Sequence, residues 1–313
     1  MSDKKIIAVL GATGRQGGGL VRAVVDDPDG PFAVRAITRR PDSRGARDLA
    51  GRGADVVQAT VDDPQALRTA FAGAYGAYVV TNFFESMSAE VEKAQAATAA
   101  QAAKVAGVAH VIWSTLEDTR RALADTGVPA LQGDYTVPHF DAKNDADEYF
   151  RDLRVPTTFL RSTFYWEAFL DGLGPRRADD GTLELTLPMG RKRLAGIASE
   201  DIGRTAYGIF QRGTETIGET VSIAGEHLTG QQYAEAFTRV LGRTVHYRPM
   251  TIEQFGNLGE PTSHEFAHMF RFYQLAEAEF VGDRDLSRVR ALNPRLQSFA
   301  QWLDRHRDAF GDS

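Results

Sequence analysis

The chain contains no cysteine among its 313 residues. This absence excludes disulfide bonds, catalysis by a thiolate and zinc sites built on cysteine. No apolar run approaches the ~20 residues that a helix needs to cross a bilayer. The start of the chain also lacks the apolar stretch of a secretory signal. We therefore expect a cytoplasmic protein that makes no membrane contact.

An excess of positive charge is also missing. The 36 lysines and arginines are outnumbered by 42 aspartates and glutamates, which gives a net charge of −6. A protein that binds nucleic acid directly carries a basic face or stripe. The cluster Arg191-Lys192-Arg193 is too short to form one. We therefore expect no direct nucleic-acid partner.

The main positive signal is the glycine-rich segment Gly11-Ala12-Thr13-Gly14-Arg15-Gln16-Gly17-Gly18. It follows the apolar run 6–10 and leads into a helical pattern. In a dinucleotide-binding turn, Gly11 permits the tight turn, Gly14 lets the backbone approach a pyrophosphate, and Gly17 lets the helix pack on the strand. The phosphates then lie at the helix N-terminus. This order of strand, turn and helix predicts a dinucleotide site.

Short apolar runs alternate with helical patterns through the first half of the chain. We expect strands at 6–10, 32–38, 55–59, 77–80, 110–114 and 157–160, and helices at 17–26, 43–50, 64–71, 88–105 and 141–153. This alternation predicts an α/β fold with a Rossmann-type doubly wound parallel sheet. We expect an NAD(P)-binding domain over residues 1–165. A smaller, mostly helical lobe for substrate or partner should follow over 166–313, with some segments returning to the main sheet.

The end of the second expected strand bears on the choice of cofactor. An acidic residue there would accept a hydrogen bond from the ribose 2′-hydroxyl of NAD. The strand instead ends in Arg39-Arg40, with no carboxylate. A guanidinium matches the geometry and the charge of a phosphate. The sequence therefore predicts NADP (NADPH), with Arg39 on the 2′-phosphate.

The ends of later strands supply further candidates. Asp62 and Asp63 precede Pro64, and we favour Asp63 as the helix cap because Asp before Pro is a strong start signal. Asp62 could either cap that helix or bind the adenine amino group. Thr81-Asn82-Phe83, after the fourth strand, would lie beside the nicotinamide. Ser114, at the end of the fifth strand, is a candidate catalytic hydroxyl.

Several segments together resemble the NmrA-like family, which belongs to the atypical short-chain dehydrogenase/reductases. They are the glycine turn, Ile37-Thr38-Arg39, Ser114-Thr115-Leu116-Glu117, Val137-Pro138-His139-Phe140-Asp141-Ala142-Lys143 and Arg161-Ser162-Thr163-Phe164-Tyr165-Trp166-Glu167. The segment from Pro138 to Lys143 is similar in particular to the redox-sensor branch of the family.

The resemblance implies a set of cofactor contacts. Gly11, Thr13, Gly14, Gln16 and Gly17 would hold the pyrophosphate, with Arg15 a further contact in the same turn. Arg39 would take the 2′-phosphate. Thr81, Asn82 and Phe83 would border the nicotinamide side, and Ser162, Thr163, Phe164 and Tyr165 would form the far wall.

The usual catalytic pair of short-chain dehydrogenases is incomplete. It consists of a tyrosine and a lysine four residues apart, which share one face of a helix. Here the lysine is Lys143, which would also contact the cofactor, and His139 stands in the tyrosine's place. An imidazole can transfer protons near neutral pH. Lys143, His139 and Ser114 are therefore the candidate catalytic residues.

Two functions remain open. The first is a redox-sensing regulator that binds NADP(H), responds to the NADPH/NADP balance and signals to a protein partner. The second is an NADPH-dependent reductase that acts on a small carbonyl, enone or quinone substrate. The missing tyrosine and the resemblance favour the regulator. In either case we expect a monomer or a homodimer.

One further motif suggests a metal. The segment His264-Glu265-Phe266-Ala267-His268 matches the His-Glu-x-x-His pattern of zinc proteases. A zinc site also needs a third ligand and an open position. Phe266, Met269 and Phe270 recur at helical spacing, which indicates ordinary packing. We therefore expect no metal site.

Overall fold

The computed structural model describes residues 4–310, which fall into two compact units. The first unit comprises the chain up to Asp118 together with His139–Ser162 and Ser199–Ser222. The second comprises Thr119–Pro138, Thr163–Ala198 and the chain from Ile223 onward. The backbone therefore passes between the units five times, and neither unit is one continuous stretch of sequence.

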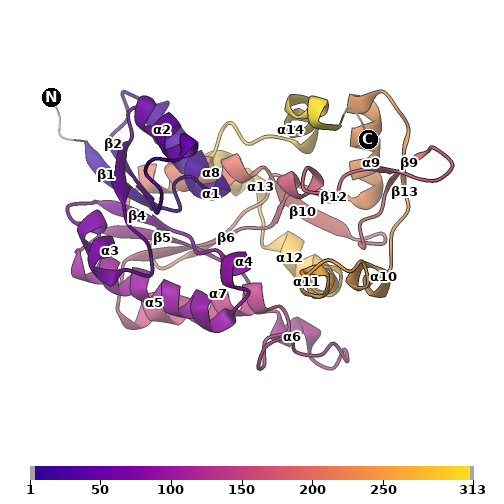
Figure 1. Ribbon diagram of the computed structural model, residues 1–313, viewed down its shortest axis with the longest axis horizontal. Helices are drawn as coiled ribbons and strands as arrows, with labels where there is room; N and C mark the ends of the chain where they lie inside the picture. Colours follow the sequence, from indigo (N-terminus) through magenta and orange to yellow (C-terminus); the bar gives the residue numbers. More distant parts are fainter. Residues whose placement is uncertain (1–3, 311–313) are drawn as a thin grey trace. The chain divides into compact units, whose positions relative to one another are not determined.

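The first unit is built on a seven-stranded sheet in the order β11-β6-β5-β4-β1-β2-β3. Every neighbouring pair is parallel, as Figure 1 shows. The strands are β1 (Lys5–Leu10), β2 (Phe32–Thr38), β3 (Asp55–Gln58), β4 (Gly76–Val79), β5 (His110–Thr115), β6 (Thr157–Arg161) and β11 (Thr220–Ser222). The strand order reverses between β1 and β4, which is where sheets of this kind bind ligands. The predicted doubly wound α/β fold is confirmed.

Helices cover both faces of this sheet (Figure 1). One face carries α1 (Arg15–Val25), α2 (Arg44–Gly51) and α8 (Ser199–Gln211), and the other carries α3 (Pro64–Phe71), α5 (Ala89–Val105) and α7 (Pro138–Asp152). A single turn, α4 (Phe83–Ser86), leads from β4 to α5. Buried alanines of α5 join Leu67, Trp113 and Phe150 in one apolar core. Small side chains let this helix lie close to the strands.

Two glycines bring α1 and α8 together. A Cβ on Gly203 of α8 would lie 2.1 Å from the backbone nitrogen of Leu20, and a Cβ on Gly19 would lie 2.8 Å from the carbonyl oxygen of Glu200. Real side chains do not reach such distances without a backbone shift. Glycine at both places therefore allows a helix from late in the chain to pack directly on the helix that follows β1.

The second unit contains two three-stranded sheets and most of the later helices. The sheets are β12 (Glu226–Thr229) with β10 (Arg193–Ile197) and β7 (Phe164–Tyr165), and β13 (Val245–Tyr247) with β9 (Leu183–Leu185) and β8 (Arg176–Arg177). The helices are α6 (Arg120–Leu123), η1 (Trp166–Phe169), α9 (Gly230–Leu241), α10 (Ile252–Gly256), α11 (Ser263–Leu275), α12 (Glu277–Gly282), α13 (Leu286–Leu292), α14 (Phe299–Arg305) and η2 (Arg307–Phe310). Within residues 4–310, no helix is both long and apolar enough to span a membrane.

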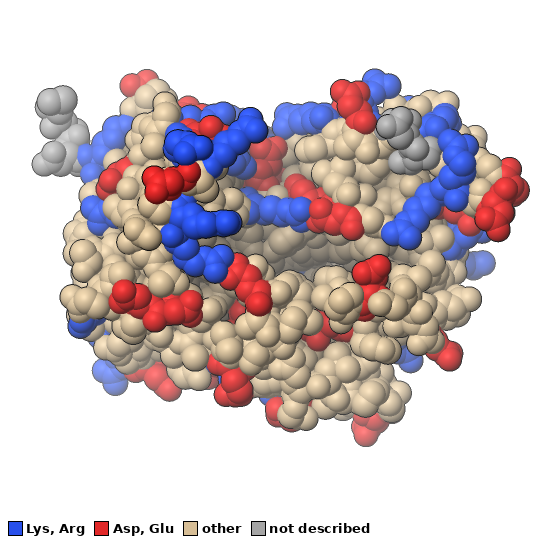
Figure 2. Space-filling view, in the orientation of Figure 1, with Lys and Arg blue, Asp and Glu red and all other residues tan. Residues whose placement is uncertain are grey.

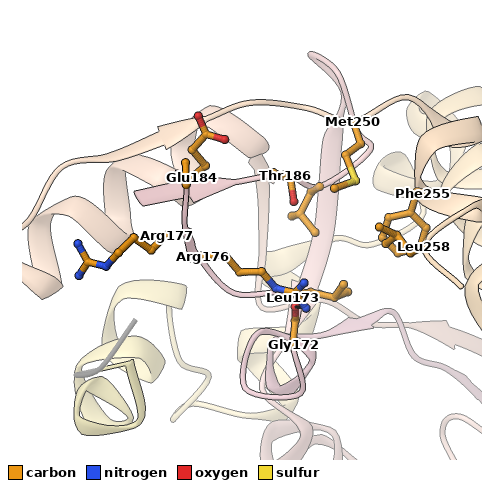
Figure 3. A pocket seen from close by; sticks show the side chains of 11 residues that line it. Gly172, Leu173, Arg176, Arg177, Glu184, Thr186, Met250, Phe255 and Leu258 are labelled. Carbon is orange, nitrogen blue, oxygen red and sulfur yellow. Dashed lines mark hydrogen bonds between the residues drawn. The ribbon is translucent and has the colours of Figure 1, made fainter. Parts of the chain in front are cut away.

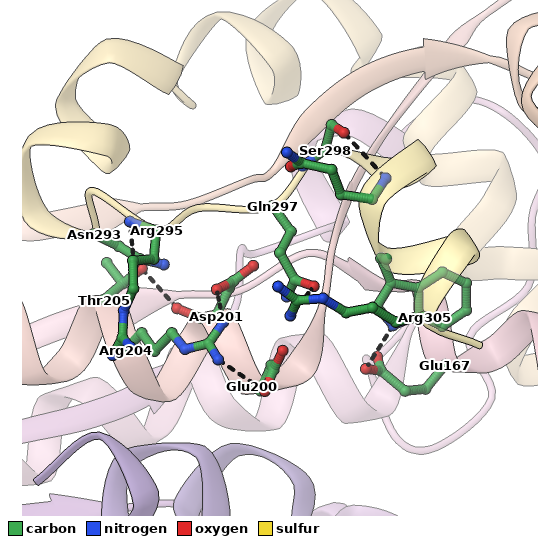
Figure 4. A network of polar contacts seen from close by, with 12 residues as sticks. Glu167, Glu200, Asp201, Arg204, Thr205, Asn293, Arg295, Gln297, Ser298 and Arg305 are labelled. Atoms are coloured by element: carbon green, nitrogen blue, oxygen red, sulfur yellow. Dashed lines mark hydrogen bonds and ion pairs between the residues drawn. The ribbon is translucent and has the colours of Figure 1, made fainter. Parts of the chain in front are cut away.

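Each unit has its own polar contacts (Figure 4). In the first unit, Arg204 of α8 pairs with Asp201 at 3.0 Å and with Glu200 at 3.2 Å. In the second, Arg305 donates to the Gln297 amide oxygen at 2.8 Å. These bonds hold single helices and the segments beside them, and none of them belongs to the site described below.

Candidate functional site

The residues predicted for the cofactor lie mostly in the first unit. Because its strands are parallel, their carboxyl ends share one edge of the sheet. The first unit holds Gly11, Thr13, Gly14, Arg15, Gln16, Gly17, Arg39, Asp62, Thr81, Asn82, Phe83, Ser114, His139, Lys143 and Ser162. Thr163, Phe164 and Tyr165 open a segment of the second unit. Their role as a far wall stays a prediction.

The glycine turn has a compact geometry. Gly11 adopts a positive φ of 73°, and its carbonyl accepts a hydrogen bond from the Gly14 amide at 2.9 Å. A Cβ on Gly17 would lie 2.4 Å from the Gly11 carbonyl oxygen. Gly14 is the N-cap residue of α1, so no side chain caps the helix, and its first turn contains no acidic residue. The positive end of the helix dipole therefore faces the turn without a negative side chain against it.

Gln16 connects this turn to the middle of the sheet. Its amide oxygen accepts hydrogen bonds from the Ser114 hydroxyl, at 2.9 Å, and from the Tyr78 hydroxyl. Ser114 and Tyr78 are fully buried. The candidate catalytic hydroxyl of Ser114 thus donates its proton within the protein. Sequence reasoning missed Tyr78, because a tyrosine inside a buried strand looks like ordinary core.

Lys143 lies in a buried polar cluster. Its ammonium donates to the Thr81 hydroxyl at 2.8 Å and to the Thr81 carbonyl at 3.2 Å, and it forms an ion pair with Glu92 of α5. Glu92 is only 1% exposed and also accepts from the Thr81 hydroxyl, at 2.6 Å. An ammonium has three protons to donate. All three have a protein acceptor here.

Glu92 was also missed from the sequence, although a signal for it exists. In an alanine-rich helix a glutamate is normally taken as part of the solvated face. Glu92 lies, however, on the stripe formed by Ala89, Ala96 and Ala99, at the three- and four-residue spacing of a buried face. All four residues are buried in the structure.

His139 lies among aromatic rings. Its ring centre is 4.8 Å from that of Phe140, 5.2 Å from that of Phe84 and 6.0 Å from that of Phe83. The side chain is 6% exposed. The residue that replaces the expected tyrosine is thus packed into an aromatic cluster that includes both phenylalanines of α4.

Arg39 carries an internal partner. Its two terminal nitrogens bond the two carboxylate oxygens of Glu85 at 2.7 Å and 2.8 Å. Both side chains are about half exposed, and the Arg39 hydrogen bond lowers the pKa of the Glu85 carboxyl. Figure 2 shows lysine and arginine side chains gathered near an acidic group over this part of the first unit. Glu85 was not predicted, because it follows β4 and not β2.

The two aspartates after β3 differ in role. Asp63 accepts hydrogen bonds from the Gln65 and Ala66 amides at 3.0 Å, so the predicted helix cap is confirmed. Asp62 accepts instead from the Gln95 amide, at 3.1 Å, and from the Thr60 hydroxyl, at 3.2 Å. These bonds show that Asp63 caps α3. They do not test the contact of Asp62 with adenine, which stays a prediction.

The His-Glu-x-x-His segment lies in α11 of the second unit. The Nδ1 atom of His268 bonds the Thr136 carbonyl at 2.9 Å. Within residues 4–310, no three His, Asp or Glu side chains are grouped as a metal site requires. The same unit has a pocket of about 140 Å³. Figure 3 shows that Leu173, Met250 and Phe255 are among the side chains lining it, with the arginines of β8 nearby.

Comparison with known proteins gives consistent matches over nearly the whole chain. A model of the NmrA-like family matches residues 3–303. The NmrA-like family domain-containing oxidoreductase lnaB of Aspergillus flavus is 28% identical over 305 residues, which cover 90% of this chain and 87% of that protein.

Solved structures share the fold. NmrA, a negative transcriptional regulator, in complex with NADP aligns with a TM-score of 0.78 at 23% identity, covering 99% of this chain and 98% of that one. The same regulator has also been solved with NAD. The triphenylmethane reductase of Citrobacter sp. complexed with NADP(H) aligns at 0.75 and 20% identity, covering 96% and 99%.

Proposed function

The chain belongs to the NmrA-like family, and from this premise we propose that it is an NADP(H)-binding regulator that responds to the NADPH/NADP balance. Its cofactor site would lie at the carboxyl ends of the parallel strands of the first unit. The pyrophosphate would lie at the glycine turn, the 2′-phosphate at Arg39, and the nicotinamide beside Thr81, Asn82 and Phe83.

Several observations support the cofactor. The glycine turn has a tight Gly11–Gly14 bond and leads into a helix end with no acidic side chain in its first turn. Such an end attracts phosphate. Arg39 offers a forked pair of donors at the end of β2. NmrA has been solved with NADP and with NAD, and the Citrobacter reductase with NADP(H).

One observation favours a regulator over an enzyme. The Lys143 ammonium directs its three protons to Thr81 and Glu92, which are both protein acceptors. A lysine that protonates a substrate directly needs an N–H donor directed at the reacting group. His139, in the place of the usual tyrosine, is packed among phenylalanine rings.

A reductase is the second candidate, because the sequence relatives are named as oxidoreductases. In that case hydride would leave the nicotinamide C4 for a carbonyl, enone or quinone. The matching proton would come from Lys143, His139 or Ser114. If Lys143 is the donor, its ion pair with Glu92 would have to open in each turnover.

The two functions can be separated with purified protein. NADPH, NADP and NAD are titrated first, and NADPH is then incubated with quinones, enones and aldehydes while its absorbance is followed. We expect NADPH to bind without turnover, and NADPH and NADP to give different rates of limited proteolysis. Turnover that is lost in Lys143→Ala but kept in the control Lys104→Ala, on the exposed side of α5, would establish the reductase instead.

A further inference from the structure

The donors predicted to bind the 2′-phosphate are already bound to a carboxylate. Arg39 and Glu85 form a forked pair with two hydrogen bonds of 2.7 Å and 2.8 Å. A guanidinium uses this same pair of N–H groups to bind two oxygens of a phosphate. The two partners therefore exclude each other, and Glu85 has to leave before a phosphate can bind in the same way.

The Glu85 carboxylate has a second hydrogen-bond partner besides Arg39. Glu85 lies in α4, 46 residues after Arg39 in the chain. Asn82, which precedes α4, donates its side-chain amide to Glu85 Oε1 at 3.3 Å. The carboxylate also lies near the negative charge of Asp62. Glu85 would thus remain close to a phosphate on Arg39 even after the pair had opened, and would repel it.

We propose, on the basis of the NADP(H) site described above, that Glu85 is a determinant of cofactor specificity that competes with the 2′-phosphate for Arg39. NAD carries a 2′-hydroxyl at this place and leaves the pair intact. For its 2′-phosphate to use this fork, NADP has to break the pair and then bear the repulsion of the released carboxylate. Glu85 therefore reduces the preference for NADP that Arg39 creates, and the chain discriminates between the two cofactors less strongly than its arginine alone would dictate.

The size of the effect follows from the exposure of the pair. Arg39 and Glu85 are 57% and 46% exposed, so water and salt screen their attraction. Exposed pairs of this kind shift an equilibrium by about two- to five-fold. The competition should therefore be small enough for NADP to overcome and large enough to measure. It should also weaken as the salt concentration rises.

The experiment compares dissociation constants of NADP and NAD for the wild type and for Glu85→Gln. Glutamine keeps the length of the side chain and removes its charge. We expect NADP to bind about two- to five-fold more tightly and NAD to bind as before. The matched control is Glu90→Gln, which removes one negative charge five residues further on, where Glu90 is 81% exposed and pairs with Lys93.

Each outcome bears on one claim. The proposed competition is wrong if Glu85→Gln leaves the ratio of NADP to NAD affinity unchanged. It is also wrong if Glu90→Gln raises this ratio as much as Glu85→Gln does. A full gain from Glu85→Gln in an Arg39→Ala background would overturn it too, because the effect would not then pass through Arg39. If the wild type binds neither cofactor, the proposed function fails instead, and the two failures are thereby distinguished.

Discussion

Asp147 is a buried carboxyl on α7, one turn after Lys143. Its side chain is 1% exposed and accepts a hydrogen bond from the Trp113 ring nitrogen at 2.9 Å. Burial raises the pKa of Asp147 to about 6, although hydrogen bonds and the charge of Arg151 oppose that rise. The folded state therefore holds this proton more tightly than the unfolded chain does.

The stability of the protein should reflect this proton. The contribution of Asp147 is complete below the unfolded pKa near 4 and is lost as the pH rises through 6. In Asp147→Asn, which keeps an acceptor for Trp113, that loss should disappear. We expect the wild type to lose about 3 kcal/mol relative to the variant between pH 4 and pH 7.

Urea unfolding at intervals across this range measures the difference. Burial lowers the pKa of His110 to about 4, so His110 acts in the opposite direction and loses its contribution as the pH falls. It is present in both proteins and cancels in the comparison. Parallel stability curves for the two proteins would show that Asp147 is charged throughout.

At the scale of single residues, the sequence predicts those site residues that the backbone geometry requires. It does not predict those that reach the site through a contact with a distant residue. Gly17 could be predicted because a helix that starts so close to a strand leaves no room for a Cβ. Glu85 could not, since its bond to Arg39 joins residues 46 positions apart and no local pattern records it. Tyr78 was hidden because a tyrosine in a buried strand looks like ordinary core. Glu92 could have been found, because it lies on the buried alanine stripe of α5.

The elements of the first unit followed their patterns closely. The structure has strand Phe32–Thr38 and helix Pro64–Phe71 with the predicted bounds, because each combines a clear period with a stop or a cap. The four-residue turn α4 was missed, since it is too short to show a helical period. In the second unit the sequence patterns at 183–187 and 245–248 correspond to strands β9 and β13. Strands β7, β8, β10 and β12 were missed, because they have only two to five residues.

The buried face of α5 gives a prediction at this scale. Glu92→Gln leaves the Lys143 ammonium buried without a countercharge, which should cost about 3 kcal/mol of unfolding free energy. Glu90→Gln, two residues earlier on the same helix, breaks only an exposed pair and should cost less than about 1 kcal/mol. Urea midpoints of the two variants compare these costs directly. Equal losses would mean that the buried ammonium of Lys143 does not depend on Glu92 as its countercharge.

Across the whole molecule, the order of segments limits how the chain can be divided. The first unit takes α8 and β11 from residues 199–222, and these follow a long segment of the second unit. The pairing of β11 with β6 joins residues about 60 positions apart. The sequence shows that late segments are strand-like or helical, but it does not show which sheet they enter.

A fragment of residues 1–165 should therefore not fold. It would lack α8, leaving the Gly19 face of α1 in water, and it would expose the edge of β6 that β11 covers. Exposed sheet edges of this kind promote aggregation. We expect the fragment to be aggregated or to unfold without a cooperative transition, as followed by circular dichroism in urea beside the full chain. A soluble fragment with a sharp transition would show that the first 165 residues are an independent domain.

The single turn α4 has one more consequence. Glu85 of this turn holds Arg39, while Phe83 and Phe84 of the same turn lie against His139. These three residues are consecutive, so both contacts are made from within one turn of helix. A displacement of the α4 backbone would therefore change both contacts together, whereas a rotation of the Glu85 side chain alone would change only the first. The Arg39 guanidinium and the aromatic cluster around His139 are in this way linked through a single turn of backbone.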